Sequence, residues 1–399
     1  MRRAHHLLLA ALLGLALSIA IGNTTRADPF IQTNLVSDVP GLATITDPLL
    51  VNPWGLSHSP TSPFWTSNQG TNTATLYAVT GSTNVSKVNI NPSPPNPPPG
   101  GFVAIPTTSV GPQGPTGQVN NTNTASFQLT PGDATTSSRF IFANLNGTIS
   151  GWGPPAGTVS LSSTIRVTTP GAIYTGLAIN QAQTQLYAAN AAAGSIDVFN
   201  GSFAPVSLGA GAFATPAAVP QGFVPFNVRD INGQVYVTYA PAGRRAQISA
   251  TEGMGAVAIF NESGVLQRVL ISGSELAAPW GLALAPASFG PFANDLLVGN
   301  FSFVDSEINA FDPLTGAFLG SIDIDPGFGH RPGGLWALDF GVGGMNGSPD
   351  TLYFTDGIDG ETHGLFAAIT PVPEPSTLAL LGFGVLSLFA LRRRRFTHA

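Results

Sequence analysis

The sequence contains no cysteine and only one lysine, Lys87, in 399 residues. The absence of cysteine excludes disulfides, thiolate metal sites and a cysteine nucleophile. Charged residues make up 9%, against about 25% in an ordinary soluble domain. Glycine (47) and proline (34) are abundant, so the chain is poor in helix formers and rich in turn formers. This composition predicts an all-β fold of many short strands.

The few charges are distributed unevenly. Basic residues gather near the two ends, and the body between Asp28 and Val372 holds eight basic against twenty acidic residues, a net charge of about −12. Nucleic acid has a dense negative charge and binds basic surfaces. An acidic body of this kind therefore excludes nucleic acid as the expected partner.

The N-terminus has the three parts of a secretory signal peptide. Arg2 and Arg3 precede an apolar run at 7–21, and Thr25-Arg26-Ala27 places small residues at the third and first positions before a cut. The pattern predicts a signal peptide at 1–27, cleaved after Ala27, and an interaction with the export machinery. An uncleaved membrane anchor is the alternative, although the apolar run is short for a span.

The C-terminal segment, 371–399, combines three features in a fixed order: Pro373-Glu374-Pro375, an apolar run at 378–391, and Arg392, Arg393, Arg394 and Arg395. A short apolar helix followed by arginines predicts a transmembrane helix with its arginines on the cytoplasmic side. The segment resembles the PEP-CTERM sorting signal of Gram-negative, exopolysaccharide-producing bacteria. This resemblance implies recognition by an exosortase-type transpeptidase, with membrane anchoring until the tail is processed. A plain C-terminal anchor is the alternative, and both place the body at the cell envelope or outside the cell.

The body, 28–370, repeats one short motif six times. Each copy has a small middle residue, and successive copies are 62, 59, 51, 54 and 56 residues apart, about 56 on average. A near-constant period of this size indicates a solenoid or a propeller. The copies are Trp54-Gly55-Leu56, Thr116-Gly117-Gln118, Thr175-Gly176-Leu177, Phe226-Asn227-Val228, Trp280-Gly281-Leu282 and Trp336-Ala337-Leu338.

Further short apolar runs follow each copy and read as strands joined by tight turns, for example 185–188 and 195–199 before Asn200-Gly201. Four antiparallel strands in each of six units predict a six-bladed β-propeller. We expect the small middle residue because the innermost strands converge at the axis. The segment 30–36 is expected to join the last blade and close the ring. The proline-rich run 91–99 and the segment 209–218 are predicted loops, and tandem sandwiches are the alternative fold.

Several motifs together resemble a family of bacterial PEP-CTERM propeller proteins. They are the segment Asn52-Pro53-Trp54-Gly55-Leu56, its copy at 278–284, the segment 361–366 and the C-terminal tail. The resemblance covers nearly the whole chain. It transfers no catalytic residue, because no activity is established for that family.

Candidate ligand-binding residues lie at or beside the inner strands, since propellers bind ligands at the channel mouth. We expect this mouth where the loops lead into these strands. Tryptophans there could stack on sugar rings or form inter-blade core, and Arg229 with Asp230 could line the mouth or form a surface pair. The candidates are Asn52, Trp54, His58, Asn227, Arg229, Asp230, Trp280, Arg331 and Trp336.

Metal binding finds weaker support in the sequence. Eleven acidic residues and one basic residue, Arg331, lie between Asp295 and Glu361, and carboxylate groups such as Asp305 with Glu307 would suit calcium. No spacing matches an EF-hand loop, however, and a solvated acidic surface is the alternative. His58, His330 and His363 are too dispersed to indicate a metal triad. We therefore expect no metal or other cofactor.

Two functions follow from these features. The first is a non-catalytic binding or scaffold module associated with the cell surface, exopolysaccharide or another surface glycan. The second is a metal-dependent hydrolase or lactonase with its site at the channel mouth, although the small residues at the inward positions disfavour it. Fold alone does not choose between them.

Overall fold

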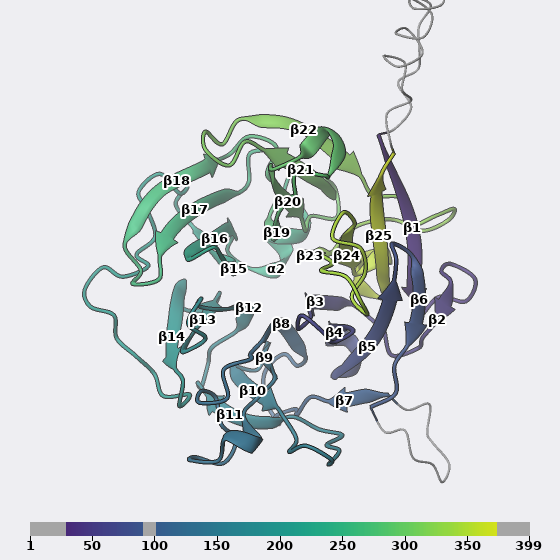
Figure 1. Ribbon diagram of the computed structural model, residues 1–399. Helices are drawn as coiled ribbons and strands as arrows, with labels where there is room; N and C mark the ends of the chain where they lie inside the picture. Colours follow the sequence, from purple (N-terminus) through teal and green to yellow (C-terminus); the bar gives the residue numbers. More distant parts are fainter. Residues whose placement is uncertain (1–28, 91–100, 373–399) are drawn as a thin grey trace, which may run out of the picture. The chain divides into compact units, whose positions relative to one another are not determined.

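The computed structural model describes residues 29–90 and 101–372. The predicted signal peptide, the proline-rich run 91–99 and the predicted transmembrane helix with its arginines lie outside the described residues. Within the described part, six sheets surround one central axis; their strands pair antiparallel except for the parallel pair β1–β2 (Figure 1). The expected six-bladed β-propeller is confirmed, and it occupies Gln32–Thr370.

Each blade begins with an inner strand at the axis. Blade 1 contains β3 (Pro53–Ser57), β4 (Phe64–Asn68), β5 (Thr73–Thr80), β6 (Asn84–Lys87) and β7 (Phe102–Ala104). Blade 2 contains β8 (Pro115–Asn120), β9 (Phe140–Asn144), β10 (Thr148–Trp152) and β11 (Thr164–Thr168). Blade 3 contains β12 (Tyr174–Ile179), β13 (Gln185–Asn190) and β14 (Ser195–Asn200).

The second half of the ring follows the same plan. Blade 4 contains β15 (Phe223–Ile231), β16 (Gln234–Pro241), β17 (Ala256–Asn261) and β18 (Leu266–Ser272). Blade 5 contains β19 (Pro279–Leu284), β20 (Leu296–Asn300), β21 (Glu307–Phe311) and β22 (Phe318–Asp323). Blade 6 contains β23 (Leu335–Phe340), β24 (Leu352–Asp356), β25 (Leu365–Pro371), β1 (Phe30–Ser37) and β2 (Ile45–Thr46).

Strand β1 lies beside β25, so the ring is closed by the N-terminal segment as expected (Figure 1). Side-chain hydrogen bonds reinforce this pairing: Ser37 Oγ donates to the Gly364 carbonyl at 2.7 Å, and Gly364 N donates to Asp38 Oδ1 at 2.8 Å. Closure removes an exposed sheet edge that could otherwise pair with another chain.

Two blades differ from the expected four strands. In blade 1 the second strand is β4, and the apolar run at 75–79 is the third strand, β5. Blade 3 has only three strands in the described chain. After Asn200 a single bridge joins Phe199 to Pro205, and Pro205 has no N–H with which to extend a ladder. The predicted loop at 209–218 follows and contains no strand.

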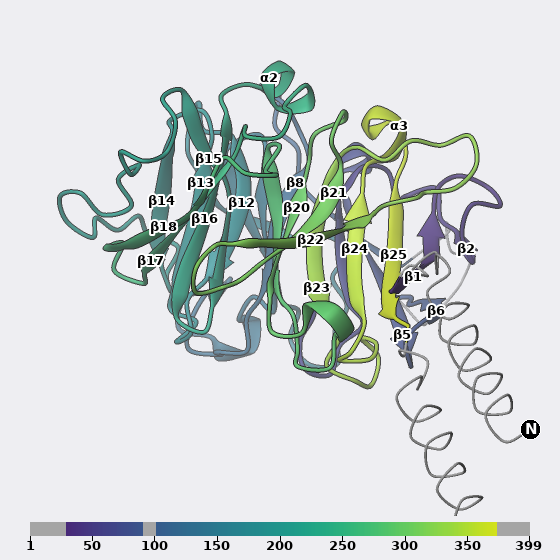
Figure 2. The same cartoon turned by 90° about the horizontal axis from the view of Figure 1, so that it is seen from above.

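Short helices mark the ends of the blades. The helices are η1 (Gln69–Thr71), η2 (Ala134–Thr136), η3 (Gly290–Phe292), α2 (Arg244–Ile248) and α3 (Ile358–Glu361). Figure 2 places α2 and α3 at the same end of the propeller. We call this the α2 end; the inner strands begin there and run to the opposite end, which we call the cavity end.

Apolar side chains from neighbouring blades interlock to form the core. Tyr187 and Val198 of blade 3, for example, share a buried cluster with Val235 and Val237 of blade 4. Burial of apolar area at six such interfaces stabilises the ring by removing it from water. The propeller thus needs no disulfide.

The small residue of the repeated motif lies where adjacent inner strands approach each other. A Cβ on Gly281 would stand 2.5 Å from the Trp336 carbonyl oxygen of the next blade, and Gly55, Gly117 and Gly176 meet the next inner strand in the same way. A register shift between the inner strand and its partner occurs at this point in all six blades. Crowding at the axis is therefore confirmed as the cause of the repeat.

Candidate ligand-binding site at the cavity end of the axis

Three tryptophans of the repeated motif meet at the axis. Trp54 of blade 1 stacks on Trp336 of blade 6, with ring centroids 3.5 Å apart and planes inclined by 20°. Trp280 of blade 5 presents an edge to both rings, with centroid distances of 6.3 Å and 5.6 Å. Their exposed fractions are 5%, 0% and 4% for Trp54, Trp336 and Trp280. We call these three residues the tryptophan layer.

Hydrogen bonds fix the orientation of two of the three indoles. Trp280 Nε1 donates to the Thr175 carbonyl oxygen of blade 3, and Trp336 Nε1 donates to Asn52 Oδ1, both at 2.9 Å. Phe226 of blade 4 lies against Trp336, with centroids 5.9 Å apart. Groups from blades 1, 3, 4, 5 and 6 thus fill the axis at this level, and the layer forms a rigid floor.

A cavity of about 350 Å³ lies on this floor, among the ends of the inner strands. Trp280 lines it from below, and every inner strand contributes to its wall, including Ser57, Gln118, Ile179 and Leu338. The sequence placed the mouth where loops lead into the inner strands. The cavity instead lies at the opposite ends of these strands, past the small residues of the repeat.

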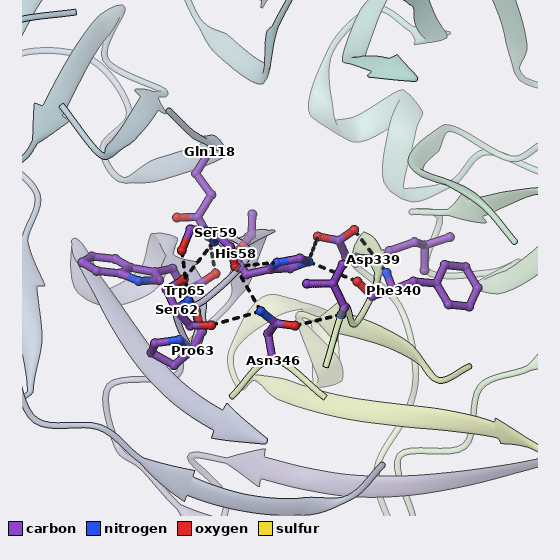
Figure 3. Close-up of polar contacts among 12 residues, drawn as sticks. His58, Ser59, Ser62, Pro63, Trp65, Gln118, Asp339, Phe340 and Asn346 are labelled. Carbon is purple, nitrogen blue, oxygen red and sulfur yellow. Dashed lines mark hydrogen bonds and ion pairs between the residues drawn. The ribbon is translucent and has the colours of Figure 1, made fainter. Parts of the chain in front are cut away.

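One side of the wall is a charged network that joins blades 1, 4 and 6. Arg229 Nη2 donates to Asp339 Oδ1 at 2.7 Å, and Arg229 Nη1 donates to the Leu338 carbonyl at 2.5 Å. His58 Nε2 is 3.6 Å from Asp339 Oδ2 and 3.1 Å from the Phe340 carbonyl oxygen (Figure 3). The exposed side-chain fractions are 33% for Arg229 and 16% for Asp339, so this ion pair is only partly screened by water.

The loops behind His58 are held together by one amide. Asn346 Nδ2 donates to the carbonyl oxygens of Ser59 and Ser62, at 3.0 Å and 3.2 Å (Figure 3). Its Oδ1 accepts from Val342 N at 2.8 Å. These bonds tie the loop after β3 to the loop after β23, so His58 is held by backbone on both sides.

Gln118 lines the cavity, and backbone carbonyls hold its amide. Its Nε2 donates to the Gly55 carbonyl at 3.0 Å and to the Trp65 carbonyl, so the two carbonyls define which amide atom is the nitrogen. The residue is 6% exposed, and its Oε1 is buried without a hydrogen-bond partner. A buried acceptor without a partner is costly, so this amide is held in place against blade 1 at the expense of one hydrogen bond.

Asp230 adds a second carboxylate to the wall, opposite Gln118. Its Oδ1 accepts from Gln181 Nε2 at 2.7 Å and from Gly233 N at 3.0 Å. Burial raises the pKa of Asp230, and the nearby charge of Glu262 raises it further, while the two donors lower it. The site therefore combines amides, one cation and carboxylates of unlike environment.

The structure brings together five of the nine sequence candidates in one cavity: His58, Asn227, Arg229, Asp230 and Trp280. Asn227 replaces the small residue of the motif, and its Nδ2 donates to the Trp280 carbonyl at 2.7 Å. The predicted Arg229–Asp230 surface pair does not form, because Arg229 pairs with Asp339 and Asp230 with Gln181.

The other four candidates lie elsewhere. Trp54 and Trp336 are buried in the tryptophan layer. Asn52 lies at the start of β3, where it donates to Gln69 Oε1 at 2.8 Å. Arg331 is exposed, and its backbone N donates to Asp359 Oδ1 at 2.9 Å. None of these four lines the cavity described above.

Sequence reasoning missed Gln118 and Asn120 as wall residues. A signal for Gln118 was present. The residue after the small position is apolar in the other five copies, Leu56, Leu177, Val228, Leu282 and Leu338, and polar only in the second. A polar residue at a position that is apolar in the other copies indicates a role specific to that blade.

The acidic segment does not form a joint metal site. Asp359 accepts from Arg331 N and contacts His330 Nδ1 at 2.7 Å, while Glu361 pairs with Arg244. Asp356 is fully buried, and burial raises its pKa to about 8. Throughout residues 29–90 and 101–372, no group of three or more His, Asp or Glu side chains is arranged to hold a metal ion. The described residues therefore offer no set of metal ligands to support the metal-dependent hydrolase hypothesis.

The C-terminal residues 371–395 match the PEP-CTERM protein-sorting motif. The chain is therefore a six-bladed β-propeller with a PEP-CTERM sorting motif, which implies export, sorting to the cell surface and processing by an exosortase. In the part of the chain with described structure, no helix has the length and apolar character to cross a membrane.

Relatives of the chain carry no assigned activity. Two uncharacterised proteins of Acanthamoeba polyphaga mimivirus are 27% and 25% identical to it. The first alignment covers 84% of this chain and 78% of the relative, and the second covers 76% and 80%. A protein of unknown function from Bacteroides thetaiotaomicron is similar in structure, with a TM-score of 0.49, 9% identity, and coverage of 86% of this chain and 76% of that one.

Proposed function

We propose that this exported propeller is a non-catalytic binding module that holds a sugar residue of a surface glycan or exopolysaccharide in the cavity at the cavity end. The observation that carries the proposal is the set of side chains that line this cavity. The amides Gln118 and Asn120, the Arg229–Asp339 pair and Trp280 all contribute to its lining. Sugars are recognised by such planar polar groups combined with an aromatic surface.

The charges of the site favour an uncharged sugar. Arg229 is already neutralised by Asp339, and Asp230 adds a carboxylate, while the whole body is acidic. A glycan that carries carboxylates or sulfates would meet repulsion here. A gram-negative cell envelope reached by export, with anchoring before tail processing, would supply such a glycan.

A glycan array of uncharged and acidic saccharides, probed with the purified full-length protein, tests this proposal. The matched variants are Ile179→Trp, which places a large ring in the cavity wall, and Val265→Trp, at a site that is 57% exposed and outside the cavity. We expect binding of uncharged saccharides to the wild type and to Val265→Trp, and at least about tenfold weaker binding to Ile179→Trp. No binding by the wild type, together with no retention in the extracellular matrix fraction of expressing cells, would contradict the proposal.

A further inference from the structure

A second and larger cavity lies between blades 1 and 2, outside the site described above. Its volume is about 790 Å³, against about 350 Å³ for the cavity on the axis. The wall comes from the loops after β3 and β8, from the start of β9 and from the end of β10. We call it the inter-blade groove.

The base of the inter-blade groove is aromatic. Trp65 stacks on Phe140 with ring centroids 4.1 Å apart, and Trp152 lies 4.8 Å from Trp65. Trp152 Nε1 donates to the Ser160 carbonyl at 2.8 Å, which fixes the indole. These three rings are largely buried and belong to one hydrophobic cluster between blades 1 and 2, so they form a rigid apolar base.

The rim of the inter-blade groove is rich in uncharged polar groups. Hydroxyls and amides of Thr61, Ser62, Asn121, Thr122, Thr124 and Thr135 line it, together with one exposed cation, Arg139. Side chains of this kind donate and accept hydrogen bonds with equal ease, as do sugar hydroxyls. The groove thus combines an apolar base and a polar rim, and it suits a ligand with both kinds of surface.

The two cavities share one lining residue. Asn120 lines both, and its Nδ2 donates to the Arg139 carbonyl of the groove at 2.9 Å. His58 belongs to the axial cavity and the next residue, Ser59, to the groove. Gln118 also donates to the backbone of Trp65 (Figure 3). Asn120 therefore lies between the two cavities, and His58 and Ser59 bring their walls together on the blade 1 side.

We infer that the two cavities form one path for an uncharged, linear glycan chain, whose terminal residue occupies the axial cavity and whose following residues lie in the inter-blade groove. This inference rests on the proposed function. It adds that the ligand is a chain of several sugar residues and that an end of this chain enters the axial cavity. The tryptophan layer fills the axis below the cavity, so a chain cannot thread through the ring. Only an end of the chain fits.

Ladders of uncharged glucan, mannan and xylan oligosaccharides, one to six residues long, test the inference by calorimetry on the full-length protein. We expect affinity for the matching ladder to rise at least about tenfold between one and four residues. A ring without chain ends, such as α-cyclodextrin against linear maltohexaose, should bind at least about tenfold more weakly if glucan is the ligand.

Matched variants separate the two cavities. Ala134 is exposed and lines the groove, so Ala134→Trp fills it without touching the core, and Ala217→Trp is the control at an exposed alanine outside it. We expect Ala134→Trp to bind a single sugar as the wild type does and to lose the gain with length, while Ala217→Trp keeps both.

The outcomes distinguish the two claims. If a monosaccharide binds the axial cavity and longer oligosaccharides bind with the same affinity, the inference is wrong and the proposed function stands. The same holds if rings bind as well as linear chains. If Ala134→Trp keeps the gain with length, the inference is also overturned. If no saccharide binds at all, the proposed function itself fails.

Discussion

The two ends of the propeller axis are built from the same repeated motif and differ in what surrounds it. At the α2 end, Asn52 accepts from Trp336 and Glu361 pairs with Arg244, which also lies 5.7 Å above the Phe303 ring. At the cavity end, Arg229 donates to Asp339, and the ends of the inner strands surround the axial cavity. We expect the first end to contribute mainly to the stability of the ring and the second end to contact the ligand. Substitutions should therefore cost stability at one end and binding at the other.

The largest effect is expected for Trp336→Ala. Trp336 is fully buried and contacts Trp54, Trp280, Phe226 and Phe301. Removing the ring leaves a cavity at the axis, and we expect the free energy of unfolding to fall by about 3–5 kcal/mol. Urea denaturation measures it. A fall of less than about 1 kcal/mol would show that the tryptophan layer is not a structural element.

The second effect comes from one carboxyl at the α2 end. Asp356 ends β24, opposite Leu335, and burial raises its pKa to about 8. Equivalent positions, opposite the first residues of β3, β8, β12 and β19, hold Asn68, Asn144, Asn190 and Asn300. The native state retains a proton that the unfolded chain releases above about pH 4, so stability is lost as the pH rises from about 4 to about 8.

Asp356→Asn should remove this loss, because asparagine has the same shape and carries no charge. We expect the variant to be several kcal/mol more stable than the wild type at pH 9 and equally stable at pH 3.5. Thermal unfolding followed by circular dichroism across this pH range measures the difference. A gain that does not depend on pH would contradict the assignment.

A smaller loss of stability is expected for Gly281→Ala. The new Cβ would stand 2.5 Å from the Trp336 carbonyl oxygen, so two inner strands must separate. Overpacking of this kind costs about 1–3 kcal/mol. Denaturant titration would show it, and an unchanged midpoint would mean that crowding at the axis does not explain the small residues of the repeat.

The smallest change in stability is expected at the cavity end. Arg229→Met removes a partly exposed ion pair with Asp339 and should cost less than about 1 kcal/mol in unfolding free energy. The same variant should weaken saccharide binding at least about tenfold, measured by calorimetry with the best ligand of the array. If Arg229→Met lost stability and kept its saccharide binding, the assignment of binding to the cavity end would be contradicted.

The fold could be predicted from the sequence because its cause is local and repeated. A small residue at Gly55, Gly117, Gly176 and Gly281 is needed wherever two inner strands cross, so the spacing of these positions reports the number of blades. Closure by β1 followed from the same logic, since an open ring would expose an edge.

The site could be predicted only in part. His58, Asn227 and Arg229 lie in a copy of the repeated motif or just after one in the sequence. This position alone predicted that they lie near the axis. The partner of Arg229 is Asp339, 110 residues further along the chain, and no local pattern encodes that pairing. The groove between blades 1 and 2 depends on how two loops pack, and the end at which the axis stays open depends on the volume of the tryptophan layer.

A crystal structure of the protein with the tightest saccharide of the array tests the central claim most directly. We predict a sugar ring in the axial cavity, in contact with Trp280 and Arg229, with the next residue of the chain passing Asn120. A saccharide bound at the α2 end, or on the outer strands of a blade, would contradict it.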